Sequence, residues 1–299
     1  MRNKKLLGNL LLLLTALIWG TAFVFQRVGM DSIEPITFTA ARSWLAAAAV
    51  GAVSLVTAKG GTAEGAAVRR RDTLLGGVCC GVFLGAASVM QQMGIVYTTA
   101  GKAGFITAMY ILIVPVLSFV LFRRRSSWLV WLAVAIGVVG MYLLCVTEDF
   151  RLTHGDTLVV ICAVLFSGHI LCCDHFVQRG DPIRISAIQF LVAAVLTTAV
   201  SFIVEQPTPE KVLSAALPIL YCGLISGGVG YTLQIVAQKF TEPTIASLLM
   251  SLESVFAVLA GALLLHETMT GRELAGCIIM FAAIILVQIP TPKKTKKEG

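Results

Sequence analysis

The chain has 299 residues, of which 57% are hydrophobic and 13% charged, and its formal net charge is +7. Soluble domains carry about 25% charged residues, so this composition excludes an ordinary soluble protein. The lysines and arginines cluster in short stretches beside long apolar segments, which is typical of topology signals and not of a nucleic-acid-binding surface. We therefore expect a polytopic protein of the lipid bilayer, with no nucleic-acid partner.

Ten apolar segments are long enough to cross a bilayer, since about 20 residues of α-helix span its hydrocarbon core. The first follows basic residues and resembles a signal peptide, but it is long enough to span and many spans follow it. Connections are short except for the polar, glycine-rich loop 58–72, so no loop can hold a soluble domain. The predicted fold is all-α, with ten transmembrane helices over these ranges: 6–28, 35–57, 73–96, 102–122, 128–146, 156–176, 182–204, 212–238, 243–265 and 271–289.

The distribution of lysine and arginine predicts the orientation. With an even number of spans both termini share a side, and that side collects seventeen of these residues against six on the other. Cytoplasmic loops carry the excess of positive charge, so we expect a multi-pass protein of the cell membrane with both termini in the cytoplasm. The basic tail 292–299 is expected to anchor this topology, and binding of anionic lipid is the alternative interpretation.

The chain contains an internal repeat. A shift of 142 residues places Gly81, Gly85 and Gln92 on Gly223, Gly227 and Gln234, and a shift of 147 places Trp19 and Glu34-Pro35 on Phe166 and Asp181-Pro182. We expect two five-helix repeats, 1–147 and 154–291. Because five is odd, the second repeat would enter the membrane from the opposite side. Such inverted repeats are common in secondary transporters, with the substrate site near the midplane between the halves.

Four stretches carry a resemblance to a known family: ALIWGTAF, TFTAARSWLAAAA, FITAMYILIVPVLSFVLFRRR and ASLLMSLESVFAVLAGALLLHETMTGRELAG. Their order and spacing resemble the EamA family of the drug/metabolite transporter superfamily over nearly the whole chain. The resemblance implies two inverted five-helix repeats, a central cavity lined by helices one to four and six to nine, and transport of amino acids and other small metabolites, often outward. In the family a proline usually follows the glutamate of the ninth helix. Here Ser254 follows Glu253, so the resemblance leaves open whether that helix bends.

Two charged residues are predicted to lie deep in the bilayer. Glu253 is ten residues past Pro243, at a depth of about 15 Å, where a carboxyl needs a partner or a wet cavity. It could bind a cationic amine, carry a proton, or pair with a buried cation and only fix helix packing. Arg42, on the second helix, could hold a substrate carboxylate, reach the outer interface or neutralise Glu253. Together the two residues would suit a zwitterion such as an amino acid.

Six further side chains are candidates to bind substrate in the same cavity. The two glutamines occupy matching repeat positions and could form gates or only interhelical hydrogen bonds. The histidine could relay protons or only pack. The two central aromatics could line the cavity or face lipid, and the tyrosine hydroxyl needs a partner when buried. These candidates are Trp19, Gln92, Tyr110, Phe166, His169 and Gln234.

No cofactor is predicted. The eight cysteines all lie in apolar runs without CxxC or Cys/His ligand spacing, so we expect small packing residues and neither a disulfide framework nor a metal site. The GGVG run at 227–230 lies inside a span with no Lys-Ser/Thr beside it, which excludes a phosphate loop. Pro115 is expected to kink the fourth helix.

These patterns predict a secondary transporter and not an enzyme. It would export small polar metabolites, with amino acids or related compounds as the expected class, by alternating access. Without a nucleotide-binding loop, an ion gradient or the substrate's own gradient must drive it, and protons are the first expectation. The alternative is an intramembrane enzyme acting on a lipid or isoprenoid, but His266-Glu267 does not continue into the HExxH zinc pattern. A scaffold or sensor would not need charges at mid-depth, and the sequence leaves monomer and homodimer open.

Overall fold

The computed structural model describes residues 2–56, 63–98, 100–124, 126–145, 153–264 and 270–288. Within these residues every regular element is a helix. Eight helical stretches are long and apolar enough to cross a membrane, and two shorter apolar helices, Trp128–Gly140 and Leu274–Leu286, accompany them. The predicted all-α membrane fold is thereby confirmed. The basic tail 292–299 and the His266-Glu267 pair lie outside the described residues.

The first half of the chain forms five segments, of which the fourth consists of two helices. In chain order the helices are α1 (Arg2–Gly29), α2 (Pro35–Val56), α3 (Ala63–Ile95), α4 (Ala100–Ala108), α5 (Tyr110–Phe122) and α6 (Trp128–Cys145). The second half repeats this order, with a short helix before its third segment and a π-helix within that segment. Its helices are α7 (His154–Val177), α8 (Pro182–Val204), α9 (Pro209–Ser214), α10 (Ala216–Leu220), η1 (Tyr221–Tyr231), α11 (Thr232–Gln238), α12 (Pro243–Met250), α13 (Glu253–Leu264) and α14 (Gly271–Gln288).

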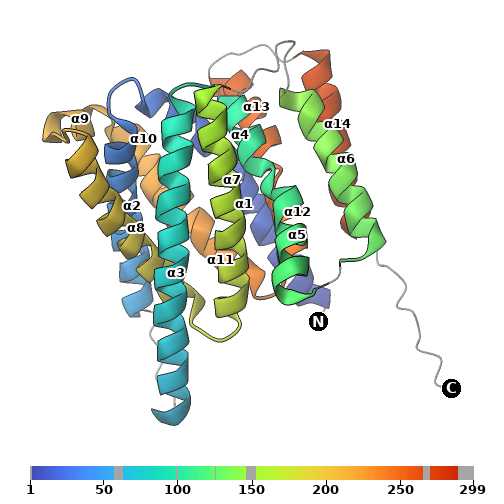
Figure 1. The fold of residues 1–299 in the computed structure, drawn as a ribbon, viewed down its shortest axis with the longest axis horizontal. Coiled ribbons are helices and arrows are strands. Elements are labelled where there is room, and N and C mark those ends of the chain that lie inside the picture. The colour runs from blue at the N-terminus through green and yellow to red at the C-terminus, as the bar shows by residue number, and fades with distance from the viewer. Residues whose placement is uncertain are drawn as a thin grey trace.

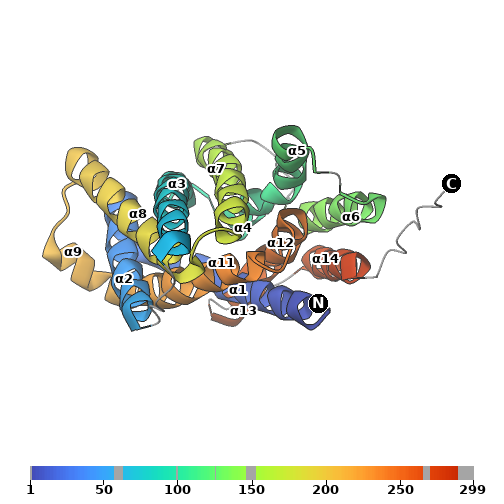
Figure 2. The ribbon, with the colours of Figure 1, turned by 90° about the horizontal axis from the view of Figure 1, so that it is seen from below.

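The two halves interlock in opposite orientations. α1 begins at the lower end of the molecule in Figure 1, called the N-terminal face below, whereas its counterpart α7 begins at the opposite face. At one end of the bundle α2 packs against α8, and at the other end α6 packs against α14 (Figure 2). α3 packs against both α7 and α8. Each of these pairings joins the first half to the second, so the halves share one core.

The loop predicted at 58–72 is shorter than expected. α3 already begins at Ala63, and it extends beyond its neighbours at the N-terminal face (Figure 1). Residues 63–71 consist largely of alanine, glutamate and arginine. These residue types have high helix propensity, so the helix continues past the apolar segment into the polar one.

The fourth and ninth segments are both broken, at equivalent positions. The fourth breaks at Met109, between α4 and α5, and the ninth breaks at Ser251 and Leu252, between α12 and α13. The repeat shift of 142 residues places Met109 on Ser251. Pro115, where a kink was expected, lies inside α5, six residues past the break. Discontinuous membrane helices of this kind commonly border the binding sites of transporters with inverted repeats.

Serines account for the break in the ninth segment. The hydroxyls of Ser247, Ser251 and Ser254 each donate to the backbone carbonyl three residues earlier, at 2.7–2.9 Å. Such bonds compete with the helical backbone ladder and bend helices, as an inserted proline would. The segment therefore breaks directly before α13 although Ser254 stands where the family usually has proline.

A residue of the second half caps α2. Glu205, the residue after α8, accepts hydrogen bonds from the backbone nitrogens of Ile36 at 2.9 Å and Thr37 at 2.7 Å. The first N–H groups of a helix have no intrahelical partner and form the positive end of its dipole, so a carboxylate stabilises them. The N-terminus of α8 is capped locally by Asp181. The Glu205 cap fastens the two halves together at the face opposite the N-terminus.

The molecule is apolar outside and polar at its centre. Large apolar side chains are exposed along α2, α5, α8 and α14, as expected for helix faces that meet lipid. Many serines, threonines and glutamines are buried instead, together with Glu253 and His169. Polar groups in a bilayer are costly unless they meet partners or a wet cavity, so their concentration at the centre indicates a functional interior.

Candidate functional site

A cavity lies at the centre of the bundle, between helices of both halves. Its volume, measured for the centres of water-sized spheres, is about 30 Å³, which is room for about two water molecules. The space is thus too small for a metabolite in this conformation. The lining side chains come from α1 (Trp19, Ala22, Phe23, Gln26), α2 (Arg42), α3 (Gln91), α4 (Thr107), α5 (Tyr110), α7 (Phe166, His169, Ile170), η1 (Ser226, Tyr231), α11 (Gln234) and α13 (Glu253).

The structure brings seven of the eight predicted site residues together around this cavity. They are Trp19, Arg42, Tyr110, Phe166, His169, Gln234 and Glu253. Gln92 is the exception: it is fully buried, and its Nε2 donates to the backbone oxygen of Gln26 at 3.3 Å. Its neighbour Gln91 faces the cavity instead. Gln92 therefore has the structural role of an interhelical hydrogen bond in this conformation.

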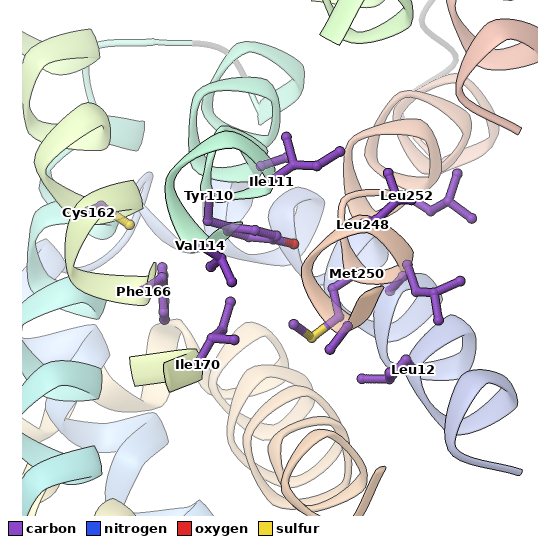
Figure 3. Packing of buried hydrophobic residues seen from close by; sticks show 14 of the residues in the cluster. Leu12, Tyr110, Ile111, Val114, Cys162, Phe166, Ile170, Leu248, Met250 and Leu252 are labelled. Carbon is purple, nitrogen blue, oxygen red and sulfur yellow. The ribbon is translucent and has the colours of Figure 1, made fainter. Parts of the chain in front are cut away.

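Glu253 lies at the cavity wall as the first residue of α13. Its side chain is buried, and the Tyr110 hydroxyl donates to its Oε1 at 2.9 Å. Tyr110 is itself the first residue of α5, so the bond joins the two helices that follow the breaks. Figure 3 shows the Tyr110 ring extending from α5 toward the break in the ninth segment. The position at a helix N-terminus also favours a negative charge on the carboxyl group.

A glycine on α1 permits this arrangement. A Cβ atom added to Gly20 would lie 2.4 Å from the Cβ of Phe256 and 2.7 Å from the backbone oxygen of Glu253. Real Cβ atoms do not approach other atoms so closely, so α1 can reach the N-terminal turn of α13 only with glycine at this position. The backbone of α1 thus lies directly against the first turn of α13.

Arg42 faces the cavity from α2. Its Nη1 donates to Oε1 of Gln26 at 3.1 Å, and its guanidinium carbon lies 5.7 Å from the centre of the Phe38 ring. Arg42 and Glu253 both belong to the described part of the chain, and they are not among the ion pairs formed there. Of the three roles considered for Arg42, neutralising Glu253 is therefore not observed in this conformation. The guanidinium retains donors for another acceptor, because Gln26 uses one of the five.

Aromatic rings form one wall of the cavity. The rings of Trp19 and Tyr231 lie 4.5 Å apart at 47°, and those of Phe166 and Tyr231 lie 6.5 Å apart. The Trp19 indole nitrogen donates to the backbone oxygen of Ser226 at 3.3 Å. Ser226 and Tyr231 belong to η1, the π-helix that includes the GGVG run. π-Helical turns are frequent at functional sites. The glycines of the GGVG run have poor helix propensity, which is the feature of the sequence that could have indicated an irregular helix here.

His169 and Gln234 place polar groups at the same wall. His169 is fully buried, and its Nε2 lies 2.9 Å from Oε1 of Gln189. The Nε2 of Gln234 donates to Oε1 of Gln238 at 3.2 Å, whereas the Oε1 of Gln234 is buried without a hydrogen-bond partner among the residues that the structure describes. A buried carbonyl oxygen without a donor costs about 1–3 kcal/mol, so this oxygen is poised to accept a hydrogen bond from a ligand or water.

Ion pairs join the helices on both sides of the cavity. At the face opposite the N-terminus, Lys102 Nζ lies 2.7 Å from Asp156 Oδ2, which ties α4 to α7. At the N-terminal face Arg124 pairs with Asp174, which ties α5 to the other end of α7. In this conformation the two pairs therefore connect α7 to the fourth segment near both of its ends.

The sequence matches the profile of the EamA-like transporter family twice, over residues 6–146 and 153–289. The two matches cover nearly the whole chain, one for each half of the bundle. The chain belongs to the EamA-like transporter family. It is therefore a membrane transporter of the drug/metabolite transporter superfamily and not an enzyme.

Relatives of this EamA-like transporter are also described as transporters. It is 28% identical over 287 residues to an uncharacterized transporter of Archaeoglobus fulgidus, and the alignment covers 96% of this chain and 87% of the relative. It is 21% identical over 276 residues to the uncharacterized transporter YoaV of Bacillus subtilis, and this alignment covers 90% of this chain and 92% of the relative. A crystal structure with 16% identity superposes with a TM-score of 0.76 over 96% of this chain and 97% of the other, which shows a shared fold.

Proposed function

We propose that this EamA-like transporter exports a small zwitterionic metabolite of the amino-acid class in exchange for protons. The observation that carries the proposal is the pair of opposite charges in the cavity. Glu253 and Arg42 both line it, and neither neutralises the other in this conformation. Buried charges in a membrane interior persist when a function or a partner stabilises them. A zwitterion supplies a partner for each.

The cavity offers complementary groups for each part of such a substrate. Arg42 has donors left over from its bond to Gln26 and suits a carboxylate. Glu253 suits an ammonium group, and the unpartnered Oε1 of Gln234 accepts a further N–H. The rings of Trp19 and Tyr231 favour an apolar or aromatic substrate side chain. The cavity must widen from its present volume to admit any of these groups.

Charge balance at Glu253 supports coupling to protons. The carboxyl is buried, and the hydroxyl of Tyr110 is the hydrogen-bond donor that it has in this conformation. Such a group avoids a net buried charge in two ways, by taking up a proton or by pairing with an ammonium group. Substrate binding would then release a proton, and substrate departure would allow a proton to return. That alternation is the chemistry of an exchanger.

The breaks and the ion pairs support alternating access. Both halves carry a broken helix at the cavity, at Met109 and at Ser251, and such discontinuities allow the outer parts of a segment to move separately. Opening toward one face would separate Lys102 from Asp156, and opening toward the other would separate Arg124 from Asp174. One chain supplies the complete cavity, so a single chain suffices whether the protein is a monomer or a homodimer.

The orientation in the cell membrane belongs to the same proposal. Seventeen of the lysines and arginines are predicted on the side of both termini against six on the other, which supports cytoplasmic termini. The face opposite the N-terminus would then be external, and export would run from the Arg124–Asp174 side to the Lys102–Asp156 side. Export itself is supported by the resemblance to the family.

Counterflow in proteoliposomes tests the proposal. Vesicles loaded with an unlabelled amino acid should accumulate the same labelled amino acid, and Glu253→Gln should abolish the uptake. Glu242→Gln is the matched control, because it makes the same change on an exposed residue directly before the same membrane segment. If no member of an amino-acid panel moves, the substrate class is wrong. If Glu253→Gln transports as well as the wild type, the assignment of Glu253 is wrong.

A further inference from the structure

Three buried side chains with soft metal-ligand atoms meet beside the cavity. The Sγ atoms of Cys80 on α3 and Cys173 on α7 lie 3.6 Å apart, and Cys173 Sγ lies 3.5 Å from Nε2 and 3.9 Å from Nδ1 of His169. One potential ligand atom from each residue lies within 4.8 Å of the others. All three side chains are fully buried. This Cys80–His169–Cys173 cluster joins the first half of the chain to the second.

The spacing of the three atoms fits the edges of a zinc coordination tetrahedron. With Zn–S bonds of about 2.3 Å and Zn–N bonds of about 2.0–2.1 Å, such a tetrahedron has S–S edges of about 3.8 Å and S–N edges of about 3.6 Å. The observed sulfur–sulfur distance of 3.6 Å, and the distance of 3.9 Å between Cys173 Sγ and Nδ1 of His169, lie close to these values. His169 and Cys173 are four residues apart on one helix, which is the spacing that places two ligands on one face. The sequence interpretation, which found no ligand spacing among the cysteines, overlooked this pair.

A second group orients the histidine as metal-bound histidines require. His169 Nε2 lies 2.9 Å from Oε1 of Gln189 on α8. An amide oxygen only accepts hydrogen bonds, so Nε2 carries the ring proton and Nδ1 keeps its lone pair. Metal-binding histidines almost always donate their other ring N–H to such an oxygen. Nδ1 is therefore the expected ligand atom, with Cys173 Sγ at 3.9 Å.

The surroundings favour a divalent ion. Two thiolates and a neutral imidazole carry two negative charges, which Zn²⁺ cancels, whereas a monovalent soft ion would leave a net charge in the membrane interior. Binding balances as one Zn²⁺ taken up and two thiol protons released, one each from Cys80 and Cys173. His169 also lines the central cavity, which gives the ion and the protons a route to water.

We propose that Cys80, His169 and Cys173 bind a Zn²⁺ ion that links α3 of the first repeat to α7 of the second. Three protein ligands leave the fourth position of the tetrahedron open for water. The bound ion would stabilise the packing of the two repeats against each other. Although His169 also lines the central cavity, the test of this site measures metal binding and not transport, so its outcome is separate from that of the proposed transport of zwitterions.

Cobalt titration of the full chain tests the site. The protein is purified in detergent, reduced, freed of metal and titrated with Co²⁺. We expect one equivalent to bind, with a thiolate-to-cobalt charge-transfer absorption that Zn²⁺ abolishes. Zn²⁺ alone should raise the thermal unfolding midpoint of the same sample. Absence of the charge-transfer absorption in the wild type would overturn the proposal, whatever the variants do.

Matched serine variants locate the ligands. Cys80→Ser and Cys173→Ser should each weaken Co²⁺ binding by about 100-fold or more, since even outer partners of zinc ligands contribute about 10–100-fold. Gln189→Leu should weaken it within that 10–100-fold range. Cys162→Ser is the control, because Cys162 is also fully buried on α7 but lies outside the cluster. Equal affinities of Cys80→Ser and Cys162→Ser would refute the assignment, and so would a Cys80–Cys173 disulfide that forms in the presence of Zn²⁺.

Discussion

Replacing Tyr110 with phenylalanine removes one hydroxyl from the cavity wall and leaves the ring in place. That hydroxyl donates to Glu253 at 2.9 Å, and both side chains are buried. A buried acceptor left without its donor costs about 1–3 kcal/mol, and more where the acceptor is charged. We therefore expect Tyr110→Phe to lower the free energy of unfolding by about 1.5–3 kcal/mol.

A double-mutant cycle separates this bond from the packing of the two side chains. Glu253→Leu removes the acceptor and leaves an apolar side chain of similar size. Once the acceptor is gone, Tyr110→Phe should cost little, because no carboxyl is left unsatisfied. The cycle should give a coupling energy of about 1–3 kcal/mol.

The assay is reversible unfolding in mixed detergent micelles, followed by tryptophan fluorescence. Tyr97→Phe is the control, because Tyr97 is 62% exposed and should change stability by less than about 0.5 kcal/mol. A coupling energy below about 0.5 kcal/mol between Tyr110 and Glu253 would refute the reasoning, since the two groups would then not share a buried bond.

Three further changes test other contacts. Gly20→Val forces a side chain into α13 and should destabilise the protein by about 1–3 kcal/mol or more. Size-exclusion chromatography compares the variants with the wild type. Gly51→Val is the control and should elute like the wild type, because no described atom lies within 4 Å of its added Cβ. The hydrogen bond from Lys211 lowers the pKa of Glu34, so this pair stabilises the protein fully above the unfolded pKa and loses its contribution as pH falls through the lowered folded pKa. The side chains of Lys211 and Glu34 are 38% and 34% exposed, so water screens the pair. Glu34→Gln should therefore reduce the loss of stability between neutral pH and about pH 3 by at most about 1 kcal/mol, as measured by thermal unfolding. An unchanged acid profile would contradict this role. Arg42→Lys keeps the charge but loses the planar fork, so substrate affinity in counterflow should fall about 10-fold or more. Arg27→Lys, on a half-exposed side chain that does not line the cavity, should leave the affinity unchanged.

The membrane segments and seven of the fifteen side chains that line the cavity could be predicted from residue type, depth and the internal repeat. A bilayer requires about 20 apolar residues for each helix, so the segments are legible without knowledge of their contacts. Charged and amide side chains within such segments are costly, and the centre of the bundle is where they are tolerated. Glu253 and Arg42 were found for that reason, and the repeat added Gln234 together with Trp19 and Phe166.

The rotation of each helix about its axis could not be predicted in the same way. Successive residues on an α-helix point about 100° apart, so Gln91 and Gln92 face different neighbours. The sequence offered both glutamines at the same depth, and the repeat favoured Gln92. In the structure Gln91 lines the cavity and Gln92 bonds to α1. Packing against other helices decides between two such residues, and the segment itself carries no signal for it.

Local distortions and long-range pairs were also beyond prediction from the sequence. The break at Ser251 depends on hydroxyl bonds to the backbone, which exposed serines do not need to make. Tyr231 enters the cavity from a π-helix, whose wider turn shifts the residues after it relative to an α-helical register. Lys102 and Asp156 are separated by 54 residues, and their contact depends on how α4 and α7 pack.

The carboxylate of Glu205 has a consequence for how the protein is made. It caps the first turn of α2 from a position 169 residues later in the chain. Ribosomes add about 5–20 residues per second, so the start of α2 emerges about 10–30 s before its cap exists. During that interval its N–H groups depend on water or lipid headgroups at the membrane surface. The N-terminal cap of α2 is thus completed only after α8 has been synthesised. The two halves of this transporter therefore mature together during biosynthesis.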